Sequence, residues 1–160
     1  MESPDLNGVR KIGYTHYIYL PSGVIDCHHW DKFCEYTEAF ITVWGKETKT
    51  RYKLEYNDAF FRFNGIEAEG WEDLYLERIN SPTEEGHNTT FVFVKTNHVP
   101  YDMGCVIILV IASMFFDAVV ISDGGSEVFE SAGKWLLAHN DPLHPFDYVY
   151  YNTRMDVFET

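Results

Sequence analysis

Residues 90–123 constrain the fold more than any other part of the chain. Positions 91–94 are apolar without interruption, an uncharged and mostly apolar stretch of 14 residues runs from Met103 to Phe116, and apolar residues resume at 119–121. That stretch is too short to cross a membrane, which takes about 20 residues, so it predicts a buried helix between two strands. Strand, helix and strand joined by short loops normally form a right-handed parallel crossover. We therefore predict a parallel β-α-β unit here, with residues 90–95 as a central strand buried on both faces.

The other elements follow from hydrophobic periodicity and turn residues. Alternation predicts a strand over 11–20, and apolar spacings of three and four predict a helix over 28–44 that ends at Gly45. An antiparallel meander and a last helix complete the set, with strands at 50–56, 59–63 and 71–79 and a helix from Ser126. The predicted fold class is α+β: a mixed, mainly antiparallel sheet with one parallel β-α-β crossover and about three helices. It forms a single domain over 1–160, with 140–160 as a C-terminal strap.

The charge balance narrows the classes of partner. The chain of 160 residues has 12 Lys and Arg against 25 Asp and Glu, a net charge of −13. A protein that neutralises phosphates needs a basic face, so nucleic acid and anionic membranes are excluded as expected partners. A strongly negative field favours a basic protein or a cation. The sequence therefore predicts an acidic protein with a basic protein partner.

Cysteine usage and the N-terminus bear on location. Three cysteines, Cys27, Cys34 and Cys105, cannot all pair within one chain, and none has the spacing of a metal finger. The first five residues are acidic and polar, unlike a secretory signal. We therefore expect a cytoplasmic protein.

The predicted crossover gathers polar residues at one edge of the sheet. Ligands of such sheets tend to bind beyond the carboxyl ends of the strands. The candidate ligand-binding residues at these ends are Lys95, Thr96, Asn97, His98, Tyr101, Asp102, Ser122 and Asp123. In a functional interpretation Asp102 or Asp123 is a base or cation ligand and Lys95 holds an anion. In a structural one Asp102 favours the helix start, Asp123 belongs to a turn, and Lys95 pairs with a carboxylate.

No complete set of nucleophile and base is recognisable. The chain has no GxSxG elbow, no P-loop and no dinucleotide fingerprint. The sequence therefore favours a protein that is not an enzyme, without deciding the question, and it predicts no cofactor.

A second cluster has residue types that suit zinc. Helical spacing lets His28 and Asp31, or Asp31 and Glu35, share a face, but no second half of a site is evident. The alternative has Asp26 as the helix N-terminal cap, with histidines that face solvent. We predict no metal, with His28, Asp31 and Glu35 as the weak candidates.

Aromatic residues near the C-terminus form a third candidate site, a protein interface. An exposed aromatic patch is typical of protein interfaces, although such residues also simply cover sheets. The interface candidates are Phe146, Tyr148, Tyr150 and Tyr151.

A pattern over residues 91–137 resembles an uncharacterised family of small bacterial proteins. The pattern comprises Lys95-Thr96, Pro100-Tyr101-Asp102, an apolar helix, Ser122-Asp123-Gly124 and a helix containing Trp135. The chain departs from it at Asn97-His98, where small or basic residues are expected. The resemblance implies a bacterial cytosolic protein and brings no activity or catalytic residues.

Two hypotheses of function follow. The first is an acidic cytosolic binding module, of the immunity or inhibitor kind, that engages a basic protein partner through charge and aromatic contacts. The alternative is a small enzyme or ligand-binding protein with a polar crevice at the carboxyl ends of the 90–95 and 118–122 strands.

Overall fold

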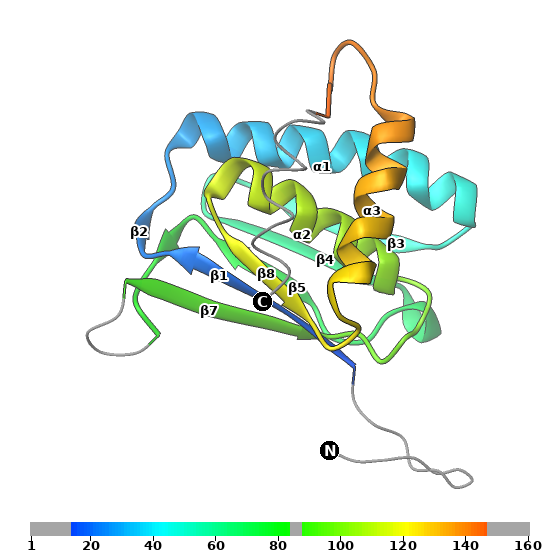
Figure 1. Cartoon of the computed structure of the whole chain (residues 1–160), viewed down its shortest axis with the longest axis horizontal. Helices are drawn as coiled ribbons and strands as arrows, with labels where there is room; N and C mark the ends of the chain where they lie inside the picture. Colours follow the sequence, from blue (N-terminus) through cyan, green and yellow to red (C-terminus); the bar gives the residue numbers. More distant parts are fainter. Residues whose placement is uncertain (1–13, 84–87, 147–160) are drawn as a thin grey trace, which may run out of the picture.

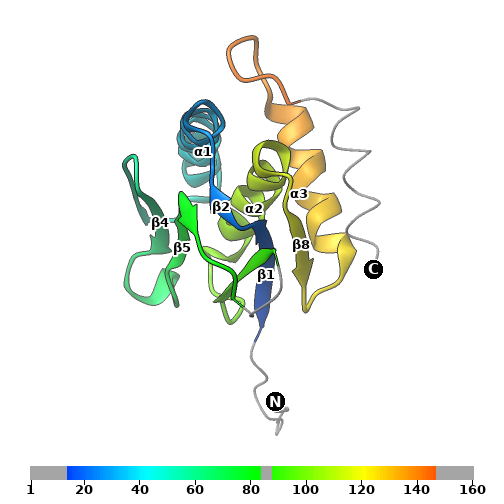
Figure 2. The same cartoon turned by 90° about the vertical axis from the view of Figure 1, so that its left-hand side faces the viewer.

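A computed structural model describes residues 14–83 and 88–146, in which three α-helices cover one face of a split antiparallel sheet (Figures 1 and 2). The helices are α1 (Cys27–Thr48), α2 (Asp102–Phe116) and α3 (Ser126–His139), and a short 3-10 turn, η1, spans Glu67–Glu69. The strands are β1 (Thr15–Pro21), β2 (Gly23–Val24), β3 (Tyr52–Tyr56), β4 (Phe60–Gly65), β5 (Leu74–Glu77), β6 (Ile79–Asn80), β7 (Thr89–Lys95) and β8 (Val119–Ser122). The predicted α+β class, mainly antiparallel with three helices, is confirmed.

The strands form two sheets of three and one small pair. Their orders are β7-β1-β8, β3-β4-β5 and β2-β6, and every pairing is antiparallel. The two larger sheets meet along β5 and β7, and at one end the N–H of Glu72 donates to the carbonyl of Lys95 at 3.4 Å. Buried apolar side chains from both sheets and from all three helices form one core.

The predicted parallel pair of strands is not formed. β7 and β8 each pair with β1 in antiparallel register, so they run in the same direction but with β1 between them. Helix α2 thus connects two strands that are not neighbours. The prediction failed because the sequence does not show which strands β1 pairs with. In the structure β1 lies between β7 and β8 and pairs with both.

Strand β7 also differs from the prediction in its burial. It lies at the edge of its sheet, and the side chain of Phe93 is 53% exposed while Val94 is buried. The prediction that both faces are buried was wrong, because the helices cover only one face.

Helix α2 lies in the middle of the helical layer, between α1 and α3 (Figure 2). That position explains why it is apolar nearly all round. Gly104 allows a close approach, since a Cβ there would lie 2.9 Å from the ring of Phe63 and 3.0 Å from Trp44. Among the described helices, α2 included, none has the length and apolarity needed to cross a membrane.

The two ends of α1 show how local sequence sets a helix. Asp26 is the N-cap, as one interpretation held, and its carboxylate accepts from the N–H of His29 at 3.3 Å. The helix continues through Gly45, where we expected it to end, and stops at Thr48 with Lys49 in the left-handed conformation (φ 57°). Gly45 serves close packing instead, because a Cβ there would lie 2.6 Å from the ring of Tyr52.

Most of the predicted strap over 140–160 lies outside the described residues. Of its start, residues 141–144 form a turn with an isolated bridge between Asp141 and His144.

Candidate functional site

Polar side chains converge where β7 and β8 end and β1 begins. The imidazole of His16, on β1, is fully buried; its Nδ1 lies 2.8 Å from the hydroxyl of Ser122, and its Nε2 lies 2.7 Å from a carboxylate oxygen of Asp102. The same oxygen accepts from the hydroxyl of Thr96. Three elements, β1, β8 and the start of α2, are therefore joined through one imidazole.

The hydrogen bonds decide the charge of this cluster. Burial raises the pKa of the Asp102 carboxyl, but the hydrogen bonds from His16 and Thr96 and the positive potential of nearby histidines outweigh it, so the pKa is lowered overall. An ionised Asp102 accepts from the Nε2–H of His16 and from the hydroxyl of Thr96. Every member of the cluster is then satisfied.

Asp123, which follows β8, binds β1 beside this cluster. Its carboxylate accepts from the N–H of Thr15 and from the hydroxyl of Tyr17, each at 3.0 Å, and its own N–H donates to the carbonyl of Thr15 at 3.0 Å. The N–H of Gly124 donates to the hydroxyl of Ser122 at 2.9 Å. Asp123 lies in the turn after β8, as the structural interpretation held, and its carboxylate also ties that turn to β1.

The remaining predicted residues do not join the cluster. The side chain of Lys95 is exposed, Asn97 and His98 adopt left-handed conformations (φ 56° and 61°), and His98 stacks on Tyr14 with ring centroids 3.6 Å apart. Tyr101 is fully buried and donates to the carbonyl of Glu72 at 2.6 Å. Of the eight ligand-binding candidates, Thr96, Asp102 and Ser122 meet through His16.

His16 is the residue that the sequence did not assign to this site. Its signal was a polar residue on the apolar face of a strand, alongside Ile18 and Leu20. Serine, histidine and aspartate in this order can support nucleophilic chemistry. However, His16 is fully buried and Ser122 is only 9% exposed, so the cluster is sealed rather than an open crevice.

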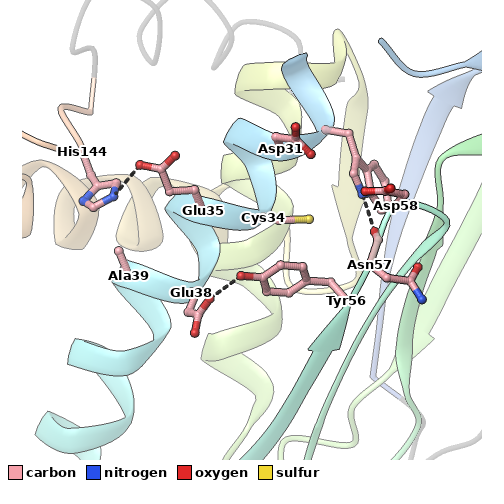
Figure 3. Close-up of a pocket in the computed structure, with 10 residues that line it drawn as sticks. Asp31, Cys34, Glu35, Glu38, Ala39, Tyr56, Asn57, Asp58 and His144 are labelled. Atoms are coloured by element: carbon pink, nitrogen blue, oxygen red, sulfur yellow. Dashed lines mark hydrogen bonds and ion pairs between the residues drawn. The ribbon is translucent and has the colours of Figure 1, made fainter. Parts of the chain in front are cut away.

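An open cavity lies on the other side of the molecule, between α1 and the β3–β4 turn (Figure 3). Its volume is about 480 Å³. We call it the acidic pocket, because four carboxylates line it and the lining contains no Lys or Arg. The lining comprises Trp30, Asp31, Cys34, Glu35, Glu38, Ala39, Tyr56, Asn57, Asp58 and His144.

Local structure sets the geometry of the acidic pocket. Asp31, Glu35 and Glu38 recur at helical spacing on one face of α1. The opposite wall is the turn at Asn57, whose carbonyl accepts from the Trp30 indole at 2.8 Å and whose side chain accepts from the next backbone N–H groups. The turn therefore holds Asp58 at the pocket.

Two of the four carboxylates have partners at the pocket. The Tyr56 hydroxyl donates to Glu38, and the Nε2 of His144 lies 3.1 Å from Glu35. Among the described residues, no ion pair or hydrogen bond of the Asp31 or Asp58 side chain is found. These two carboxylates are thus available to a ligand.

The carboxylates of the pocket affect the pKa values of two neighbouring side chains, Cys34 and Tyr56. Burial and then the carboxylates of Asp31, Asp58 and Glu38 raise the pKa of the Cys34 thiol to about 12. The hydrogen bond to Glu38, followed by burial, raises the pKa of Tyr56 to about 12. Burial disfavours any charge at the site, whereas the carboxylates around Cys34 and Tyr56 disfavour an anion and favour a cation.

The weak metal candidates do not form a centre. Asp31 and Glu35 line the acidic pocket, whereas His28 is exposed and packs edge-on against His29. Within residues 14–83 and 88–146, no three His, Cys, Asp or Glu side chains lie close enough together to hold a metal ion.

The predicted aromatic interface falls mostly beyond the described residues. Phe146 is 4% exposed and belongs to the core, so it cannot provide an exposed anchor. Tyr148, Tyr150 and Tyr151 lie outside the described part of the chain.

Comparison with known proteins adds no relative: no protein-family model, curated protein or solved structure matches the chain.

Proposed function

We propose that the protein is an acidic binding module of the immunity or inhibitor kind, which engages a basic protein partner through the acidic pocket. The observation that carries the proposal is a cavity lined by four carboxylates and by no Lys or Arg. The bacterial and cytoplasmic setting expected from the sequence is part of the same proposal.

Charge complementarity supports a cationic occupant at two scales. The net charge of −13 provides a long-range field that speeds encounter with a basic partner. At short range, Asp31 and Asp58 line opposite walls of the pocket, one on α1 and the other on the β3–β4 turn (Figure 3).

The shape of the pocket suits a long basic side chain. Its volume of about 480 Å³ is within the range of pockets that bind small groups. Lys and Arg lay their aliphatic stems along apolar surface and keep the charged end at polar groups. Ala39 and the Trp30 indole provide apolar wall beside the carboxylates.

Fluorescence anisotropy with a labelled hexa-arginine peptide tests this function. The double variant Asp31→Asn/Asp58→Asn removes the two available carboxylates, and both side chains are exposed, so folding is retained. Each lost charge contact is worth about 0.2–1 kcal/mol, so loss of both should raise the Kd about 2- to 30-fold.

The matched control is Glu127→Gln/Glu130→Gln, at exposed positions of α3, which changes the net charge equally. We expect less than about a twofold rise in Kd for this control, because only the long-range field is altered. Equal weakening by both double variants would mean that the peptide senses net charge alone and would remove the pocket from the proposal.

A small enzyme or ligand-binding protein is the second candidate, and the Ser122–His16–Asp102 chain is the observation that favours it. It requires the sealed cluster to open to a substrate. Hydrolysis of p-nitrophenyl acetate that is lost in Ser122→Ala, at unchanged Tm, would support it. Activity equal in the parent and the variant would count against it.

A further inference from the structure

The outer face of the β7-β1-β8 sheet is mostly apolar, with the exposed Lys95 at its end, and no described element covers it. Side chains that alternate with the buried ones point to this side, and the three helices lie on the other side (Figure 2). We call it the aromatic face; its members are Tyr17, Tyr19, Phe91, Phe93, Val119 and Ile121.

The aromatic rings of the aromatic face contact one another. The ring of Phe91 stacks on Tyr17 at 5.7 Å between centroids, and lies 4.9 Å from Tyr19 and 5.9 Å from Phe93. Three of the six side chains remain exposed by more than a third: Tyr19 (36%), Phe93 (53%) and Ile121 (37%). A contiguous apolar patch of this kind marks an interaction surface in soluble proteins.

A groove continues the aromatic face toward β5. It has a volume of about 300 Å³ and is lined by Asp73, Tyr75, Glu77, Asn80, Thr90, Phe91, Val92 and Phe93. At one end β5 and β7 are joined by Glu72 and Lys95, and at the other the side chain of Thr83 accepts from the N–H of Phe91 at 2.6 Å. The groove is therefore short, and it fits one side chain rather than an added strand.

The lining of the groove has aromatic rings on both walls and carboxylates on the β5 side. Tyr75 and Glu77 come from β5, and Phe91 and Phe93 from β7. No Lys or Arg is among the lining residues. Asp73 already pairs with Arg62, so Glu77 and the rings of Phe91 and Phe93 are the groups that complement a further guanidinium, which stacks on rings and pairs with carboxylates at the same time.

The chain already contains one example of this chemistry next to the groove. The guanidinium of Arg62 lies 5.3 Å from the ring centroid of Phe60 and 5.6 Å from that of Tyr75. It also pairs with Glu55 at 3.2 Å and with Asp73 at 3.5 Å. The groove offers a second guanidinium the carboxylate of Glu77 and the rings of Phe91 and Phe93.

We propose that the β5–β7 groove and the aromatic face together bind a segment of the partner in which an arginine is flanked by aliphatic residues. The arginine enters the groove between Tyr75 and Phe93, and the aliphatic residues cover the aromatic face. This inference rests on the proposed function for the identity of the partner as a basic protein, but it uses a surface that shares no residue with the acidic pocket.

NMR titration of the full, isotope-labelled chain tests the proposal with two probes, acetyl-Leu-Arg-Leu-amide and acetyl-Leu-Lys-Leu-amide. We expect the arginine peptide to shift the backbone amides of Tyr75, Phe91 and Phe93, and the lysine peptide to bind there more weakly. Phe93→Leu keeps an apolar residue but removes the ring, so the arginine peptide should bind this surface about threefold more weakly. Val43→Ala, at another exposed apolar residue, is the control and should leave binding unchanged.

The outcomes separate this inference from the proposed function. Shifts confined to the amides around Asp31 and Glu38 would overturn the inference and leave the acidic pocket standing. Shifts at the groove with none at the pocket would support the inference and overturn the acidic pocket as a binding site. Equal binding of the two peptides, or full binding by Phe93→Leu, would overturn the guanidinium site. A dimer in sedimentation velocity that Phe93→Ser dissolves would show that a second copy covers the face, and would also overturn it.

Discussion

Removal of the Asp102 carboxylate should destabilise the fold in a way that depends on pH. In Asp102→Asn the charged acceptor that Nε2 of His16 and the hydroxyl of Thr96 share is lost, while the shape of the side chain is kept. Hydrogen bonds to a charged group contribute about 1.5–3 kcal/mol each, and an Asn oxygen replaces part of this. His16 is fully buried and Asp102 is 18% exposed, so solvent cannot compensate fully. We expect the free energy of unfolding at pH 7 to fall by about 3 kcal/mol.

The sign of the pH dependence follows from the lowered pKa of Asp102. Its usual pKa is 3.8, and in the folded protein it is lower. Its contribution to stability is therefore fully present above the unfolded pKa and is lost as the pH falls through the folded pKa. The difference between the parent protein and Asp102→Asn should shrink below pH 4, because the parent then carries a neutral acid at this position.

Urea denaturation at several pH values measures both effects through the midpoint and slope. Glu127→Gln is the control, since Glu127 is the acidic residue in the first turn of α3, as Asp102 is in α2. The control removes a favourable charge near a helix N-terminus, which is worth about 0.3–1 kcal/mol. A loss in Asp102→Asn no larger than in the control, or a difference that stays constant down to pH 2, would refute the account of the cluster.

Two further predictions concern packing and cysteine chemistry. Gly65→Ala should destabilise the protein by about 2 kcal/mol or more, since its Cβ would lie 2.2 Å from the Glu69 carbonyl oxygen, and a urea midpoint equal to that of the parent would contradict this. Iodoacetamide at pH 8 should modify Cys27 alone on the time scale of minutes, because Cys27 is exposed whereas burial raises the pKa of Cys34 to about 12 and also that of Cys105. Mass spectrometry measures the number of adducts. Two or three adducts formed at the same rate would show that the reagent reaches the buried thiols, and would contradict this prediction.

Periodicity predicted most of the elements, because it reports which face of each element is buried. The helix at α1, the apolar helix at α2 and the strands β3 and β4 lie close to their predicted ranges. The strand predicted over 71–79 is instead divided into β5 (Leu74–Glu77) and β6 (Ile79–Asn80), which belong to different sheets. Pairing between distant strands was not predictable in the same way. The register of β1 with both β7 and β8 depends on tertiary contacts, and this pairing separates the two strands that we expected to be neighbours.

The same limit applied to the sites. Thr96, Asp102 and Ser122 were expected near one another from their places at strand ends, but the residue that joins them, His16, comes from a strand whose position was unknown. The acidic pocket combines α1 with the turn at Asn57 and with His144, three segments that no local pattern connects. Helical spacing made Asp31 and Glu35 weak candidates for metal ligands, and no metal was predicted. In the structure both line the acidic pocket together with Asp58, which lies far away in the sequence.

The most direct test of the central claim is to observe the pocket carboxylates themselves. Carbon-13 spectra of the side-chain carboxyl groups, recorded with and without the hexa-arginine peptide, follow each Asp and Glu separately. We predict that the resonances of Asp31 and Asp58 move most and saturate together, while Glu127 on α3 stays in place. Shifts spread evenly over all exposed carboxylates, or absent at Asp31 and Asp58, would contradict the proposal that the acidic pocket is the binding site of a basic partner.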